Sequence, residues 1–95
     1  MNSTQTESIL SMLKTDLGIM STTAYDERLT QYLTNAESSI TEEGVTLDLE
    51  NVKDCQLVVM YAAWTWRKRE NGEGMPRMLR YALNNRIFSE KVSNG

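Results

Sequence analysis

Two pairs of adjacent carboxylates come nearest to catalytic chemistry in this chain, because paired acids can share general acid and general base roles. They are Asp26-Glu27 and Glu42-Glu43. Each pair lies at an expected helix end, where acids interact with the helix dipole or face solvent. The chain has no histidine and one cysteine, so neither a histidine base nor a zinc-like site is expected. We therefore predict no catalytic residue, no metal, no cofactor and no enzymatic activity.

A glycine-rich segment, Asn71-Gly72-Glu73-Gly74, has the composition of a phosphate-binding loop. No predicted strand precedes it, and it lacks the lysine that such a loop places on phosphate groups. We interpret it as a turn between two helices. Pro76 supports this interpretation, because proline suits the first turn of a helix, where its missing N–H would have no partner.

Aromatic and basic residues lie together at the end of the most apolar segment. Trp64 and Trp66 come just before Arg67-Lys68-Arg69. Basic residues beside aromatic ones are typical of surfaces that bind nucleic acid. Three further arginines follow: Arg77, Arg80 and Arg86. However, bases at the C-terminus of a helix also favour its dipole, and a pI of about 4.9 is wrong for a dedicated DNA-binding protein. We favour a protein interface as the role of the tryptophans.

The segment from Asn51 to Glu70 predicts the longest uninterrupted helix. Apolar residues at helical spacing form one stripe: Val52, Cys55, Val59, Ala62, Ala63 and Trp66. Others lie off the stripe: Leu57, Val58, Met60, Tyr61 and Trp64. A helix that is apolar over most of its circumference must be covered by other helices, so we expect it at the centre of the fold. Cys55 is expected to be a small core residue rather than a reactive thiol.

Three further helices are predicted around this central one. The first covers about residues 6–17, after a capping box at Thr4-Gln5-Thr6-Glu7, and ends at Gly18. The second starts at Thr23-Ala24-Tyr25-Asp26, which repeats the hydroxyl-to-acid spacing, and ends at Gly44. Residues 45–50 form either an extended arm or a loop, after which Asp48 or Asn51 caps the central helix. The fourth helix covers about residues 76–88.

The expected fold class is all-α, a compact bundle of about four helices around a central apolar helix at about 51–69. One domain covers residues 1–95, with flexible ends at about 1–5 and 89–95. No apolar run approaches the roughly 20 residues of a membrane span, and the N-terminus lacks the features of a signal peptide. We therefore expect no membrane partner and a chain that is cytosolic as made.

The two halves of the chain carry opposite net charge. Residues 1–50 hold nine acids and two bases, which gives −7, and residues 51–95 hold eight bases and four acids, which gives +4. If the fold keeps the halves on different faces, the acidic face of one copy can contact the basic face of the next, and such head-to-tail contacts can close into a ring. The alternative is that the two halves neutralise each other within one monomer.

Four segments of the chain resemble, in order, the small phage head-to-tail connector proteins, a family also described as head-completion, adaptor or DNA-packaging proteins of tailed phages and prophages. The segments are LKTDLGI from Leu13, YDERLTQYLTNAESSI from Tyr25, QLVVMYAAWTWRKR from Gln56 and MPRMLRYALNNRIF from Met75. The resemblance covers roughly residues 9–88 and consists of helix type and spacing. The chain departs from the family in its very short C-terminal tail.

This resemblance implies a structural virion protein that forms a homo-oligomeric ring at the portal vertex. It would extend the DNA channel and join head to tail during DNA packaging and assembly, after synthesis in the host bacterial cytoplasm. The implied partners are the portal protein, the next head-completion or tail protein, and double-stranded DNA that passes without sequence-specific binding. With the charge pattern it gives an expected interface: Glu27, Glu37, Glu42, Glu43, Tyr61, Trp64, Arg67, Arg69, Arg77, Met78 and Arg80.

The competing hypothesis is a small helical DNA-binding regulator. Its third and fourth helices would present bases to phosphate groups, from Arg67-Lys68-Arg69 and from Arg77, Arg80 and Arg86. This hypothesis predicts steeply salt-dependent binding to short duplexes, because each phosphate contact releases counterions. The connector hypothesis predicts little affinity for free DNA and an assembly state that changes with protein concentration.

Overall fold

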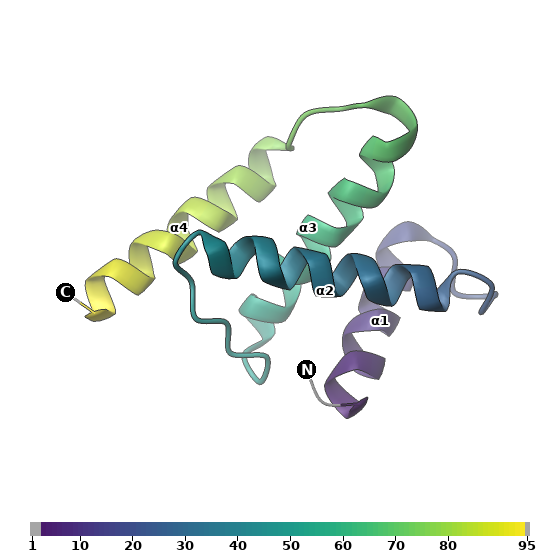
Figure 1. The fold of residues 1–95 in the computed structure, drawn as a ribbon, viewed down its shortest axis with the longest axis horizontal. Helices are drawn as coiled ribbons and strands as arrows, with labels where there is room; N and C mark the ends of the chain where they lie inside the picture. Colours follow the sequence, from purple (N-terminus) through teal and green to yellow (C-terminus); the bar gives the residue numbers. More distant parts are fainter. Residues whose placement is uncertain (1–2, 95) are drawn as a thin grey trace.

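The computed structural model describes residues 3–94 and contains four α-helices, with no strand in that range. They are α1 (Ser3–Leu17), α2 (Asp26–Glu42), α3 (Val52–Asn71) and α4 (Arg77–Asn94). Figure 1 shows α2 lying across α1 and α3, while α4 returns alongside α3 in the opposite direction. The predicted all-α bundle is confirmed.

The central position of α3 is also confirmed. This helix packs against α1, α2 and α4, whereas α4 packs mainly against α3. The buried core draws on all four helices and on the loop before α3: Ile9, Leu13, Leu29, Leu33, Ala36, Ile40, Val45, Leu57, Val58, Val59, Ala62, Ala63, Leu79 and Leu83. The molecule is thin, with Cα extents of 44 × 31 × 17 Å, so much of α4 has no second layer over it.

The predicted stripe of α3 is wrong at its first position. Val52 is 66% exposed, whereas Asp54 in the same first turn is buried, so this turn packs through another face than the predicted one. Leu57 and Val58, which lie off the stripe, are buried. Trp66 is half-buried and makes edge-on contacts with the rings of Tyr25 and Tyr32, at centroid distances of 5.8 and 5.3 Å.

The helix ends predicted at Gly18 and Gly44 are confirmed, and Gly72 ends α3 in the same way. Gly18, Gly44 and Gly72 have φ values of 72°, 97° and 64°, which is the left-handed region that ends a helix at little cost only for glycine. At the start of α3, the Asn51 side chain accepts a hydrogen bond from the Lys53 N–H at 2.8 Å. Asn51 is therefore the cap, and residues 45–50 form a loop rather than an extended strand.

Both predicted capping boxes are wrong. Helix α1 already begins at Ser3, so Thr4 to Glu7 lie inside its first turns. Helix α2 begins at Asp26, after an N-cap at Tyr25 that makes no side-chain capping bond. The hydroxyl of Thr22 instead accepts from the Ala24 N–H at 3.1 Å, which stabilises the turn that precedes the helix.

Helix α4 continues to Asn94, so its predicted end near residue 88 is wrong. The reason is an anchor at Glu90, whose side chain accepts from the Thr46 N–H at 2.7 Å and pairs with Arg86 at 3.2 Å. At the other end, Met1 and Asn2 lie outside the described residues, as does Gly95.

Candidate interaction surfaces

The most buried ionic cluster joins α3, α4 and the loop between α2 and α3. Asp54 is 4% exposed and accepts from Arg86 Nε at 2.8 Å and from the Asp48 N–H at 2.8 Å. Arg86 also donates to the Thr46 carbonyl at 2.7 Å and to Glu90 at 3.2 Å. The hydrogen bond to Asp54 raises the pKa of Arg86 further above its ordinary value. These contacts hold the loop against α4.

Sequence reasoning missed this cluster and placed Arg86 among the bases that could contact phosphate. A signal was present, because Asp54 precedes Leu57 and Val58 by three and four residues and so shares their face of an apolar helix. A charge on a buried face needs a partner of opposite charge. Nothing in the local sequence identifies Arg86 as that partner.

The predicted acidic residues lie on or just after α2. Glu27, Glu42 and Glu43 are exposed and Glu37 is half-buried, and none of the four makes an ion pair among the described residues. A groove of about 450 Å³ runs between α1 and α2. It is lined by Thr6, Thr30, Thr34, Glu37, Ser38, Thr41 and Glu42. Its hydroxyl and carboxylate lining suits a cationic side chain better than an apolar one.

The structure divides the predicted basic residues into two groups. Arg67 pairs with Asp16 of α1 at 3.3 Å, and Arg69 lies over the Trp66 ring at 3.9 Å and near Glu70 at 3.5 Å. In contrast, Arg77 and Arg80 on the first turn of α4 are exposed and make no ion pair within the described part of the chain.

The aromatic side chains predicted for the interface mainly contact residues of their own chain. Tyr61 and Trp64 are half-buried and meet edge-on at 5.4 Å, and the Trp64 indole N–H donates to the Glu73 carbonyl at 3.2 Å. Lys68 lies 4.5 Å from the Trp64 ring centroid. Met78, in contrast, is 75% exposed. Of the predicted apolar interface residues, Met78 is thus the one that leaves most surface for a partner.

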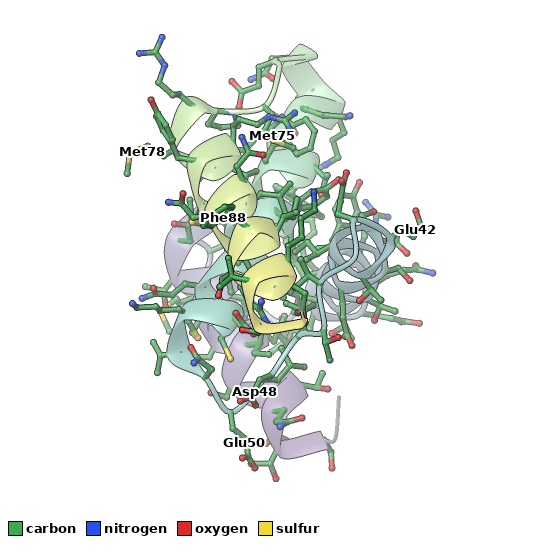
Figure 2. The ribbon with its side chains drawn as sticks, turned by 90° about the vertical axis from the view of Figure 1, so that its left-hand side faces the viewer. Glu42, Asp48, Glu50, Met75, Met78 and Phe88 are labelled. Atoms are coloured by element: carbon green, nitrogen blue, oxygen red, sulfur yellow. The ribbon has the colours of Figure 1, made fainter. Side chains whose placement is uncertain are left out.

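The predicted acids and bases that make no ion pair lie in different places, the acids on or just after α2 and the bases on α4. Arg67 pairs with Asp16 across the two halves of the sequence, but Lys14 pairs with Asp26, and Arg86 with Asp54 and Glu90, inside their own halves. Among the described residues, this leaves Glu27, Glu37 and Glu42 of α2 and the first-turn bases of α4 without ion-pair partners. Figure 2 shows Glu42 and Met78, which mark these two helices, on opposite sides of the molecule.

Helix α4 also exposes a row of large apolar side chains that sequence reasoning recognised only at Met78. They are Met78, Tyr81, Phe88 and Val92, each at least 63% exposed. With Asn85 between them, the steps along the chain are 3, 4, 3 and 4 residues, which places all five on one face. The opposite face of α4 carries Leu79 and Leu83, both buried against α3.

Cys55 is half-buried, and its thiol donates to the Leu49 carbonyl at 3.1 Å. Burial raises the pKa of this thiol above its ordinary value, and the nearby charges of Asp54 and Asp48 raise it further. A thiol in these surroundings is a weak nucleophile, because the thiolate is the reactive form.

Within residues 3–94, no cluster of three or more Cys, Asp or Glu side chains could hold a metal ion. None of the helices in that range is both long and apolar enough to cross a membrane. Comparison of the chain with protein-family models, with curated proteins and with solved structures finds no match.

Proposed function

We propose that this protein is a structural component of a tailed-phage virion that forms a ring at the portal vertex, extends the DNA channel and joins head to tail. The observation that carries the proposal is the separation of unpaired acids on α2 from unpaired bases on α4. Different surfaces that complement each other produce a heterologous contact, which repeats from copy to copy and closes when the rotation allows.

The proposed contact places Arg77 and Arg80 of one copy against the acidic groove between α1 and α2 of the next, where Glu37 and Glu42 lie. Solvated ion pairs contribute only about 0 to 1 kcal/mol each, so these charges mainly select the register and direction of assembly. Apolar contact must supply most of the affinity, and Met78 lies between the two arginines in sequence and is 75% exposed.

In this role the protein is not an enzyme and needs no cofactor. Its partners are other copies of itself, the portal protein and the next head-completion or tail protein. Double-stranded DNA passes through the channel without sequence-specific binding. The resemblance of residues 9–88 to phage connectors supports this assignment, and the charge separation supplies an independent reason for head-to-tail assembly.

Charge reversal tests the proposal. The variant Arg77→Glu with Arg80→Glu should remain folded and lose assembly, and Glu37→Lys with Glu42→Lys should behave in the same way. A mixture of the two variants should partly restore assembly, because each then offers the surface that the other needs. Arg28→Glu is a matched control, since Arg28 is also exposed but lies outside the proposed contact.

Light scattering over a concentration series, with and without purified portal protein, measures the outcome. A two-fold isologous dimer, or a chain that stays monomeric at high concentration beside the portal, would contradict the ring. The DNA-binding alternative is weakened, because Arg86 donates to Asp54, Glu90 and the Thr46 carbonyl and is not available to contact phosphate groups. Steeply salt-dependent binding to short duplexes would nevertheless return the assignment to that alternative.

A further inference from the structure

We propose that the outer face of α4 and the adjoining groove bind an acidic amphipathic helix of a different protein. We call this region the α4 docking surface. It consists of the stripe Tyr81, Asn85, Phe88 and Val92 and of the groove floor Leu57, Met60 and Ala82. The inference goes beyond the ring, because it concerns a second partner: in the proposed ring Arg77 and Arg80 contact the next copy, and the apolar stripe with Lys53 and Lys91 remains for this partner.

The stripe has the spacing of one helix packing against another. Its members are separated by 4, 3 and 4 residues, the pattern of apolar positions along a two-helix seam, with Asn85 as a polar residue within it. Tyr81, Phe88 and Val92 are 63%, 68% and 64% exposed. Figure 2 shows α4 at the front of the molecule, with Met78 pointing away from the body. Large apolar side chains exposed in a row on one helix face are typical of an interaction site.

A groove next to the stripe widens this surface. It has a volume of about 500 Å³ and lies between α3 and α4. Leu57, Met60 and Ala82 give it an apolar floor, and Asn85 belongs both to its lining and to the stripe. Side chains that project from one face of a helix at intervals of three or four residues fit such a groove, as in helix-in-groove recognition.

Charge identifies the kind of helix. Lys53 lines the groove on the α3 side, and Arg77, Arg80 and Lys91 are exposed on α4. None of these four cations makes an ion pair within the described residues. The acids closest in sequence to the site are turned to Arg86 instead, Asp54 at 2.8 Å and Glu90 at 3.2 Å. An apolar surface bordered by free cations complements an apolar stripe bordered by acids.

A second copy of this chain is a poorer occupant. An antiparallel pair of α4 helices would bring Arg77 of one copy close to Lys91 of the other, which is a like-charge contact. A parallel pair would leave the groove floor and the cations without partners. Among the described residues outside α4, the exposed large hydrophobic side chains are Met20, Tyr25 and Val52, which lie on no common helix face. The occupant is therefore a helix of another protein.

The test uses a synthetic peptide of about 18 residues, or about five helical turns, with leucine on one stripe and glutamate beside it. A matched peptide has lysine in place of every glutamate. Each is titrated against the full chain by fluorescence anisotropy, below the concentration at which light scattering detects assembly. We expect saturable binding of the acidic peptide, at least about tenfold tighter than the basic one, which corresponds to about 1.4 kcal/mol.

Two variants assign the binding to the α4 docking surface. Phe88→Asp should weaken binding of the acidic peptide at least about tenfold without unfolding the chain, because Phe88 is 68% exposed. Met20→Asp is the matched control and should leave binding unchanged, since Met20 is 56% exposed in the turn after α1.

Four outcomes would overturn the proposal. They are an absence of saturable peptide binding, equal binding of the two peptides, self-association that Phe88→Asp abolishes, and binding to anionic phospholipid vesicles that Phe88→Asp abolishes while the peptide fails to bind. The third would assign the surface to a second copy and the fourth to a membrane, because basic amphipathic helices also bind anionic lipid.

Discussion

Removing the carboxylate of Asp54 should destabilise this protein more than removing any exposed charge. Asp54→Ala deletes two contacts with Arg86, at 2.8 and 3.4 Å, and the acceptor for the Asp48 N–H at 2.8 Å. The side chain of Asp54 is 6% exposed and that of Arg86 is 23% exposed. Water can therefore replace the carboxylate only partly.

The size of the effect follows from these contacts. Breaking a fully buried ion pair costs about 3 to 5 kcal/mol, mainly because the remaining charge is left buried without a partner. Arg86 keeps Glu90 and the Thr46 carbonyl as partners and is partly exposed, which lowers the cost. The lost hydrogen bond to the Asp48 N–H raises it by about 1 to 2 kcal/mol. We expect a net loss of about 3 kcal/mol, a large part of the stability of a small domain.

Urea unfolding followed by circular dichroism at the helical band measures this loss as a lower midpoint with an unchanged slope. A double-mutant cycle with Arg86→Ala isolates the pair, and the two substitutions together should cost at least about 1 kcal/mol less than the sum of the single ones. Arg77→Ala, which removes an exposed and unpaired base, is the control and should change stability by less than about 0.5 kcal/mol. A loss below about 1 kcal/mol for Asp54→Ala, or additive single effects, would refute the reasoning.

Two further predictions concern single sites. Gly44→Ala should cost about 1 kcal/mol, because φ is 97° there and no heavy atom lies within 4 Å of an added Cβ, so the cost is one of backbone conformation alone. Gly74→Ala, where φ is not in the left-handed region and the space is also open, should cost nothing measurable in the same urea experiment. The raised pKa of Cys55 means that the folded state holds the thiol proton more tightly than the unfolded state. Its stabilising contribution is thus present below the ordinary value of 9.0 and lost as pH rises through the higher folded value, so Cys55→Ala should reduce the decline of stability above pH 9.0. Labelling by a thiol reagent at a pH just below 9.0 should also be slower in the folded than in the urea-unfolded chain, and equal rates would contradict the burial argument.

Features that depend on neighbouring residues were predictable from the sequence. The helix ends at Gly18 and Gly44 follow from a conformation that other residues rarely adopt. The sequence limited the cap of α3 to Asp48 or Asn51, and the structure selects Asn51, whose side chain reaches an N–H two residues away. The central position of α3 follows from an apolar surface that only other helices can cover.

Features that depend on distant pairs were not predictable in this way. The contact between Asp54 and Arg86 spans 32 residues, and the one between Thr46 and Glu90 spans 44. Both involve polar residues that, taken locally, suit a solvated surface. The second contact explains why the end predicted for α4 near residue 88 was too early, since Glu90 holds the last turns in place. The two capping-box predictions were wrong for a different reason. The hydroxyl-to-acid spacing recurs by chance in a chain rich in serine and threonine, so the local pattern occurs without the capping structure.

The two apolar faces of α4 explain why its role was harder to predict than its existence. Leu79 and Leu83 give the periodicity that predicts a helix packed on α3, and Tyr81 and Phe88 satisfy the same periodicity on the other side. A sequence pattern alone cannot distinguish a helix buried in its own domain from one that divides its surface between the domain and a partner. The structure shows which case applies to α4. The molecule is thin, so α3 covers one face of α4 and the outer stripe remains exposed. The same helix holds the loop at Thr46 through the bonds of Arg86 and Glu90, while its outer stripe stays exposed.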